Sequence, residues 1–332
     1  MNGQQIEELN ENYSYYQLWV QYKDSGHSPM LIFTASLLNA IVVPGIFMNI
    51  GILLITFKYR QKLIQPFSGF GIISLRATSS FLLALTALFE TVHQFGNLFF
   101  LCVSLSGRNF VPYFTAFKFL VIPLVGCSAS LALIALTGLD RLIQLAFEKW
   151  HAKVNRTVYL GTFMLISLFF SILMGLKYAQ IAFCHPKWPQ TGTISDIFLF
   201  EFKPIFFSFM LMANFIAILF YVFIWVVVKW KRGEFFKTNT NARLFKSLVV
   251  IISISIGCYL ISAVVRLFVL PPLHLDQVKV WFVELYFGIL LNLGVALNAP
   301  VLFICSKDYR KCFVREFALL RSKLAKLHSF VQ

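Results

Sequence analysis

The sequence of 332 residues is poor in charged side chains, which make up only 13% of it. Soluble globular proteins carry about 25% charged residues, so this chain has too little charge to cover a folded surface in water. Apolar residues account for 58% of the chain, Phe occurs 38 times, and the mean hydropathy is +0.75. The composition therefore disfavours a pair of soluble domains and favours a bilayer as the solvent.

The sequence also lacks the short motifs of common catalytic sites. It contains no HExxH zinc signature, no GxSxG nucleophile elbow, no Walker loop and no GxGxxG turn. The six Cys residues show neither CxxC nor Cys/His spacing. We therefore expect no metal site, no cofactor and no enzymatic activity.

Seven apolar segments are long enough to cross the hydrocarbon core, which takes about 20 residues as a helix. The second segment is the least uniform, because Arg76, Glu90 and His93 interrupt it. The sequence predicts an all-α membrane protein built as a seven-transmembrane helix bundle. The segments lie approximately at 30–57, 74–100, 112–139, 158–182, 204–228, 248–270 and 280–304.

Lys and Arg residues are concentrated on one side of this predicted bundle. Most of the 29 basic residues fall in the loops after the first, third and fifth segments and in the C-terminal tail, whereas Asp196, Glu201 and Asp276 lie in the opposite loops. Because basic loops face the cytosol, we expect an extracellular N-terminus, a cytosolic C-terminus and a plasma-membrane location. The net charge of +15 is then explained by basic residues at the cytosolic membrane surface, and no nucleic acid partner is expected. Asn12, in an N-x-S sequon outside, is a predicted glycosylation site, and the sequon at Asn155 is expected to stay bare.

Three regions follow from this topology: an extracellular tail at 1–29, a seven-helix domain at 30–305 and a cytosolic segment at 306–332. In the last region, Phe313 and Phe317 fall on one helical face with basic residues around it. That pattern predicts a short amphipathic eighth helix on the inner leaflet. Cys312 stands where palmitoylation is chemically accessible, and an unmodified buried thiol is the alternative.

Two polar motifs interrupt the apolar segments near their predicted cytosolic ends. Asp140 and Arg141 stand at the end of the third segment. The alternative interpretation is a charged pair whose side chains extend to the membrane–water interface without a further role. Asn298 and Pro300 interrupt the seventh. The Pro removes one backbone hydrogen bond and weakens the helix, so this stretch is either a switch or a mere kink.

These motifs resemble those of the G-protein-coupled receptor superfamily. The Asp140-Arg141 pair is similar to its acidic-Arg motif, and Asn298-Ala299-Pro300 is a variant of its Asn-Pro-x-x-Tyr motif. The Asn-Ala-Pro stretch followed by SKDYRKCF resembles, more specifically, the nematode chemoreceptors of serpentine receptor class sx, and FETVHQFGN and SGRNFVP agree with it. The resemblance runs from about residue 45 to residue 317. It implies a chemosensory receptor that couples to a heterotrimeric G protein through the cytosolic ends of helices three, five and six.

The chain departs from most rhodopsin-like receptors in several ways. Ala87 or Thr86 stands near the place of the Asp that supports a sodium ion, and the sixth segment lacks the Cys-Trp-x-Pro motif. The Cys expected at the start of helix three is absent from the residues at 113–119, which leaves Cys184 without its usual partner. Cys102 can replace that partner in a disulfide, and the pairing stays open.

Four ionisable residues lie at membrane depth toward the outer side: Glu90, His93, Arg266 and Glu284. Because a charge is costly in hydrocarbon, each is a candidate for a functional site, and together they are candidates to line one outer cavity for a small, partly apolar ligand. The structural alternative is that Arg266 neutralises Glu284 and Glu90 neutralises His93. A seven-span transporter or ligand-gated channel, and a receptor for a peptide such as a neuropeptide, remain alternative functions.

Overall fold

The computed structural model describes residues 16–62, 78–197, 202–230 and 239–331. The predicted glycosylation site Asn12 lies outside these residues. Helices account for nearly all of the described chain. They are α2 (Tyr16–Tyr22), α3 (Pro29–Lys62), α4 (Thr78–Leu105), α5 (Tyr113–Ala146), α6 (Glu148–Lys153), α7 (Arg156–Cys184), α8 (Phe202–Trp230), α9 (Asn239–Val264), α10 (Gln277–Ala296), α11 (Asn298–Cys305) and α12 (Lys307–Val331).

Six helical stretches of the described chain are long and apolar enough to cross a membrane, and a shorter apolar stretch covers Ser253–Val269. The prediction of an all-α membrane bundle is therefore confirmed. The shorter stretch corresponds to the sixth predicted segment and consists of the end of α9 and a π-helical turn, η4 (Val265–Val269). A 3₁₀ turn, η5 (Pro271–Leu273), follows where two Pro residues end the helix.

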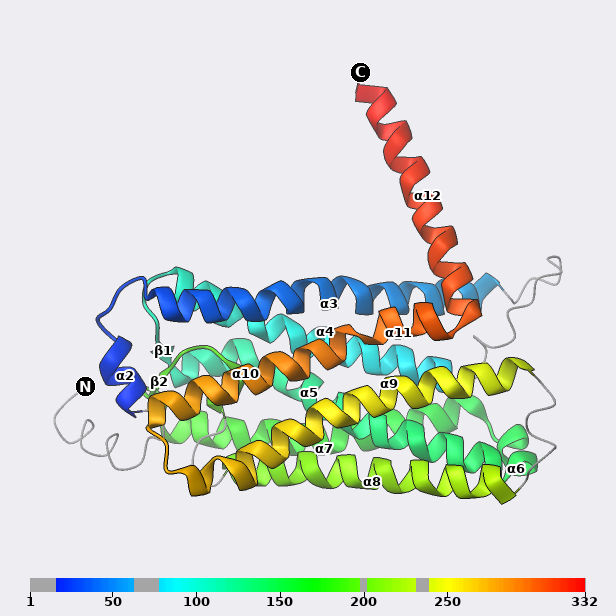
Figure 1. The fold of residues 1–332 in the computed structure, drawn as a ribbon, viewed down its shortest axis with the longest axis horizontal. Helices are drawn as coiled ribbons and strands as arrows, with labels where there is room; N and C mark the ends of the chain where they lie inside the picture. Colours follow the sequence, from blue (N-terminus) through cyan, green and yellow to red (C-terminus); the bar gives the residue numbers. More distant parts are fainter. Residues whose placement is uncertain (1–15, 63–77, 198–201, 231–238, 332) are drawn as a thin grey trace.

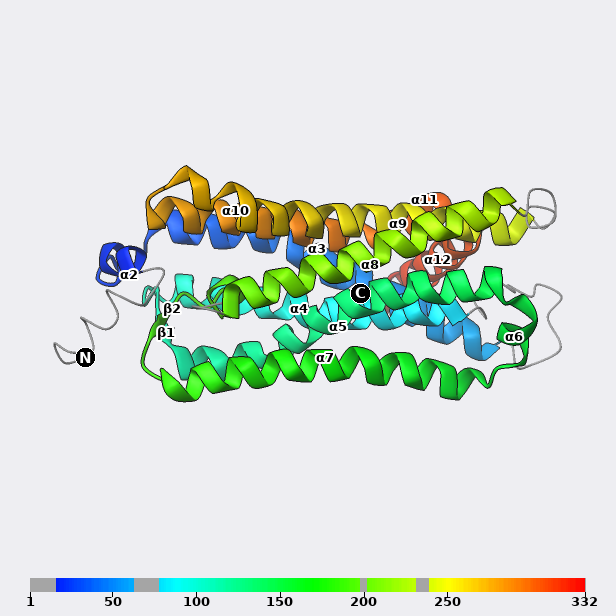
Figure 2. The same ribbon diagram turned by 90° about the horizontal axis from the view of Figure 1, so that it is seen from below.

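The central helix of the bundle is α5. Of its most apolar window, 72% is buried, compared with 28% for α8. It packs against α4, α7 and α8, and α10 closes the bundle by packing against both α3 and α9. Figure 1 shows the long helices running along one common axis, and Figure 2 shows α7 on one edge with α9 and α10 on the other. The large apolar side chains exposed on α7 and α8, such as Leu165 and Phe223, suit contact with hydrocarbon.

Gly126 allows α5 to approach α4 closely. A Cβ atom at this position would lie 2.8 Å from the carbonyl oxygen of Phe89 and 3.0 Å from the backbone nitrogen of His93. Both neighbours are backbone atoms of α4, so they cannot turn aside as a flexible side chain would. Small residues bring helices together in this way in membrane bundles, and Gly126 therefore sets the distance between α4 and α5.

One end of the bundle, here called the loop end, is covered by chain that lies between the helices. Strands β1 (Val111–Pro112) and β2 (Pro189–Gln190) pair antiparallel, with Val111 opposite Gln190. A 3₁₀ turn, η2 (Ile194–Ile197), follows β2. The segment from Trp188 to Ile197, called the outer loop, is largely buried, and Tyr113 at the start of α5 donates from its hydroxyl to the Ile197 carbonyl at 2.8 Å.

The N-terminal helix α2 is also held against the loop end. Asn109, whose backbone φ of 59° lies in the left-handed region that Asn tolerates, donates from its side-chain amide to the carbonyls of Tyr22 at 2.9 Å and Gly26 at 2.7 Å. Leu18 of α2 is fully buried. The segment that follows residue 15 is therefore packed on the bundle through several contacts.

The opposite end, here called the α12 end, contains the Asn-Ala-Pro stretch. The helix is interrupted at Leu297, between α10 and α11, so that Pro300 falls in the first turn of α11, where a missing N–H is tolerated. Ser306 then separates α11 from α12. Figure 1 shows α12 leaving the bundle and running across its long axis.

The cysteines are unpaired in the structure. Cys102 and Cys184, for which the sequence left a disulfide open, are both free and exposed. Cys312 is free and buried in a small core formed by α12, α3 and α11. Its burial favours the unmodified thiol over palmitoylation.

Candidate functional site

A cavity of ≈ 50 Å³ lies directly beneath the outer loop. Thr193, Ile194 and Ser195 of the outer loop line it on one side, and residues from α3, α4, α5, α8, η4 and α10 line the rest. Its walls are mainly apolar, with Phe207 and Met210 from α8 among them. The volume is enough for a few water molecules or a very small ligand without rearrangement.

Polar side chains that are not fully satisfied border this cavity. His93 and Arg266 both line it, and both are at least nine-tenths buried. Within the described part of the chain, the Nε of Arg266 has no hydrogen-bond partner. Neither ring nitrogen of His93 makes a well-formed hydrogen bond, and the ring lies near the backbone carbonyl of Pro123. Buried polar groups normally have partners, so these atoms are available to a bound molecule. Asn97 and Asn292, which also line the cavity, are joined by a hydrogen bond of 3.3 Å.

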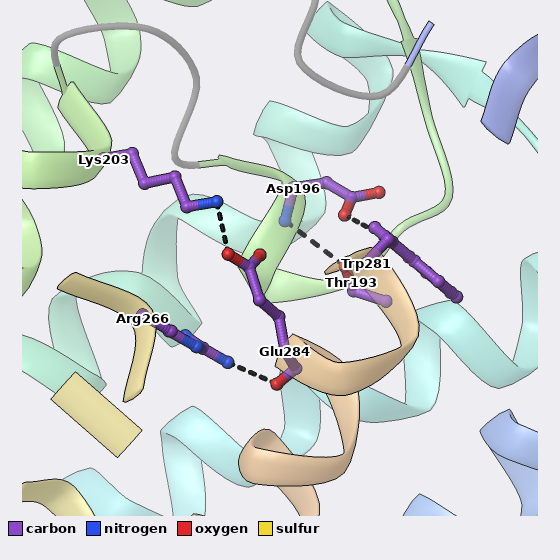
Figure 3. A network of polar contacts seen from close by, with 6 residues as sticks. All are labelled: Thr193, Asp196, Lys203, Arg266, Trp281 and Glu284. Carbon is purple, nitrogen blue, oxygen red and sulfur yellow. Dashed lines mark hydrogen bonds and ion pairs between the residues drawn. The ribbon is translucent and has the colours of Figure 1, made fainter. Parts of the chain in front are cut away.

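Arg266 is held by the main chain of α10 and an aromatic ring of α8. Its Nη2 donates to the carbonyl oxygen of Glu284 at 2.6 Å, and its guanidinium carbon lies 4.7 Å from the centroid of the Phe207 ring. The carboxylate of Glu284 instead forms an ion pair with Lys203 of α8 (Figure 3). The structure therefore assigns Glu284 a different side-chain partner from the Arg266 that the sequence suggested.

Asp196 fixes the outer loop above the cavity (Figure 3). It accepts a hydrogen bond of 2.8 Å from the indole nitrogen of Trp281 on α10, and bonds from the backbone nitrogen and hydroxyl of Thr191 at 3.0 and 2.6 Å. Burial raises the pKa of Asp196 above its usual value, although these hydrogen bonds act in the opposite direction. The loop that covers the cavity is thus anchored to a helix that lines it.

Glu90 lies away from the cavity lining. Its Oε2 accepts a hydrogen bond of 2.8 Å from Asn298 at the start of α11, and it is fully buried. Gln94, one turn further along α4, accepts a buried hydrogen bond of 3.4 Å from Asn49 of α3. Of the four predicted ligand residues, His93 and Arg266 line the cavity. Glu284 lies beside it, and Glu90 of α4 contacts Asn298 of the Asn-Ala-Pro stretch.

The predicted coupling pair occupies the α12 end of α5. Arg141 is buried and donates from Nη1 to Gln144 at 2.7 Å, and an Asp140 oxygen lies 3.2 Å from the Nε2 of His151 on α6. The side chains of Asp140 and Arg141 therefore have different hydrogen-bond partners. His151 and Gln144 were not predicted as part of this site, because no local pattern distinguishes them from other polar residues at a helix end.

Comparison with known proteins gives one family match, which covers most of the chain. A family model described as serpentine type 7TM GPCR chemoreceptor Srsx matches residues 42–317. The matched range reaches from α3 to α12 and contains the Asn-Ala-Pro stretch, the Asp-Arg pair and every cavity-lining residue except Leu38. No curated protein matches the chain.

Proposed function

We propose a chemosensory function for this chain, because it belongs to the Srsx family of serpentine 7TM GPCR chemoreceptors. The family match confirms the resemblance that the Asn-Ala-Pro stretch and SKDYRKCF indicated, and it does so over nearly the same residues. The family is one of receptors in a membrane and not of enzymes. In this proposal, the protein binds a small extracellular ligand and signals through a heterotrimeric G protein.

The observation that carries the ligand proposal is the cavity under the outer loop, with the unpartnered nitrogens of His93 and Arg266 on its wall. A guanidinium N–H is only a donor, and a neutral imidazole is both donor and acceptor. The ligand proposed here is therefore small and largely apolar, and it carries at least one hydrogen-bond acceptor. Such a ligand would satisfy buried groups that have no partner in the described structure.

Signalling is proposed to follow from a population shift. The ligand would bind more tightly to a conformation in which α8 and α9 separate at the α12 end, where Arg141 would become accessible to a G protein. The bond between Asn298 and Glu90, which lies one turn of α4 from the cavity residue His93, supports a coupling between the two ends. We place the loop end outside the plasma membrane and the α12 end in the cytosol, since the basic residues concentrate at the α12 end.

Nucleotide exchange tests the coupling part of this proposal. Arg141→Ala is expected to lower agonist-dependent nucleotide exchange on a co-expressed Gα subunit while surface expression is kept. Lys153→Ala, which removes an exposed positive charge from nearby α6, is the matched control and is expected to leave exchange unchanged. Exchange that is equal in Arg141→Ala and the parent chain would count against coupling through this end.

A ligand screen read out by G-protein activation tests the binding part. For any agonist found, His93→Asn is expected to raise the half-maximal concentration, because the ring lines the cavity. His274→Asn is the control: His274 is exposed and has a φ of 43°, which Asn accommodates. Equal potency in the two variants would place the ligand elsewhere.

Glycosylation mapping tests the orientation and separates the receptor from a transporter or channel with an internal N-terminus. Asn12→Gln is expected to remove a glycan-dependent shift in electrophoretic mobility, whereas Asn155→Gln is expected to change nothing. A glycan on Asn155 instead would reverse the proposed topology. A peptide ligand, the other alternative, would be identified by the same screen if peptides are included.

A further inference from the structure

An apolar groove of ≈ 660 Å³ lies at the α12 end, and it shares no lining residue with the cavity under the outer loop. Three helices form it, with Phe47 and Leu54 from α3, Ile304 from α11, and Phe317 and Leu320 from α12 among its lining residues. All five of these side chains are exposed. On α12, the positions 313, 317 and 320 recur at helical spacing, so one face of that helix is apolar.

The groove combines membrane depth with a charged rim. Its floor belongs to two of the helical stretches that are long and apolar enough to cross a bilayer, Pro29–Tyr59 and Gln277–Cys305. Its rim carries Lys58, Glu316 and Lys323. Apolar walls beside exposed cations are typical of the boundary between hydrocarbon and headgroups.

The charges on this rim are not balanced. Glu316 accepts from Lys58 at 2.6 Å and from the hydroxyl of Tyr59 at 2.8 Å, so its carboxylate is already engaged by α3. Lys323 is exposed, and no ion-pair partner is found for it among the described residues. The Arg315 guanidinium lies over the Tyr59 ring at 5.9 Å. The rim therefore keeps a net positive charge next to an exposed apolar surface.

We propose that this groove binds one anionic glycerophospholipid from the leaflet at the α12 end. An acyl chain would lie along the side chains of α3 and α11, and the phosphate and acidic headgroup would meet Lys323. A zwitterionic lipid would fill the same apolar surface but would gain less at the cationic rim, because each basic residue near a membrane surface attracts anionic lipid by about 1 kcal/mol. The inference is independent of ligand binding and of G-protein coupling.

The bound lipid would bridge α12 to the bundle. In the protein itself, α12 is attached by polar contacts of its first three turns, from the hydroxyl groups of Tyr309 and Thr56, 3.1 Å apart, to the ion pair of Glu316 with Lys58. The groove lies between α3 and the later turns of α12, from Phe313 to Lys323. A lipid in this position would therefore hold the part of α12 that leaves the bundle.

Photocrosslinking of the full-length protein in nanodiscs tests the proposal. The probes are phosphatidylserine and phosphatidylcholine that carry the same diazirine acyl chain, each added in trace amount to unlabelled phosphatidylcholine. Phosphatidylserine is expected to label peptides within 47–58 and 299–323 about fivefold more than phosphatidylcholine, the ratio that about 1 kcal/mol gives. Equal labelling by the two probes overturns the proposal.

Two pairs of variants make the test specific. Ile304→Trp fills the groove and is expected to abolish its labelling, whereas Leu165→Trp on α7, where the parent residue is equally exposed at 69%, is expected to have no effect. Lys323→Gln is expected to reduce the preference for phosphatidylserine severalfold, and Lys311→Gln, on the same helix but outside the groove, is expected to preserve it. Groove labelling that survives Ile304→Trp, or an equal loss in both Lys variants, also overturns the proposal.

Discussion

Glu90 of α4 and Asn298 of α11 are joined by a buried hydrogen bond of 2.8 Å, although 208 positions separate them in the chain. The Asn298 amide donates to Oε2, and the other carboxylate oxygen has no partner among the described residues. Because α11 begins at Asn298, this bond ties the first turn of α11 to the middle of α4. The side chain of Asn298 thus bonds to a neighbouring helix. It does not bond to the backbone carbonyl that loses its donor at Pro300.

Removing the Asn298 amide should destabilise the protein more than changing the acceptor. Asn298→Ala leaves both oxygens of Glu90 buried without a described donor, which costs about 1–3 kcal/mol, whereas Glu90→Gln keeps an oxygen that can accept. Thermal unfolding of the purified protein in detergent should rank the parent chain first, then Glu90→Gln, then Asn298→Ala. The double variant Glu90→Ala/Asn298→Ala is the control, and effects that simply add would show that the two residues are not coupled.

The close approach of α4 and α5 gives a second prediction. Gly126→Ala places a Cβ within 2.8 Å of a backbone oxygen of α4, so the two helices must separate. Overpacking of this kind costs about 1–3 kcal/mol, and we expect a lower unfolding temperature and less protein at the cell surface. Gly161→Ala on α7 is the matched control, because no atom lies within 4 Å of the Cβ it would introduce. Equal behaviour of the two variants would contradict the packing described for Gly126.

The burial of Asp196 predicts a pH dependence of stability. Its pKa is raised in the folded protein above the ordinary value of 3.8, mainly because of burial, so the folded state holds the proton more tightly than the unfolded state does. The contribution of this proton to the free energy of unfolding is fully present below pH 3.8. It is lost as the pH rises through the folded-state pKa of Asp196. The unfolding temperature of the parent protein should therefore fall as the pH rises through this range. The unfolding temperature of Asp196→Asn should not show this fall. A parallel pH profile in the two proteins would be inconsistent with a raised pKa.

The cysteines differ in predicted reactivity. Cys102 and Cys184 are exposed and free, whereas burial is the main cause that raises the pKa of the Cys312 thiol to about 11. Because the thiolate is the reactive form, a maleimide should modify Cys102 and Cys184 in the folded protein and Cys312 only after unfolding. Mass spectrometry of peptides from the labelled parent protein, which retains all six cysteines, measures this order. Labelling of Cys102 and Cys184 that requires prior reduction would demonstrate the disulfide that the structure lacks.

The helical bundle could be predicted from the sequence because hydrocarbon imposes long apolar runs. Helix ends were less predictable, since hydropathy marks the part of a helix in contact with lipid and not its full length. The third predicted segment ended at 139, but α5 continues through Asp140 and Arg141 to Ala146. Those charged residues ended the apolar pattern without ending the helix, because Asp140 contacts His151 and Arg141 donates to Gln144.

The site was harder to predict, because it depends on which helices become neighbours. Helical spacing placed Glu90 and His93 on one face, but His93 lines the cavity and Glu90 contacts α11. Lys203 was not recognised as a partner of Glu284, since the two lie 81 positions apart and no local motif connects them. Asp196 was read only as a carboxylate in an outside loop, whereas its bond to Trp281 makes it the anchor of the outer loop.

The buried outer loop has a kinetic consequence. Thr193, Ile194 and Ser195 lie over the cavity, and Asp196 fastens them to α10. If the proposed ligand enters through this face, the outer loop has to move first, and loop motions of this kind take microseconds to milliseconds. The exchange rate of the proposed ligand would then be limited by movement of the loop that Asp196 holds against Trp281, and not by diffusion alone.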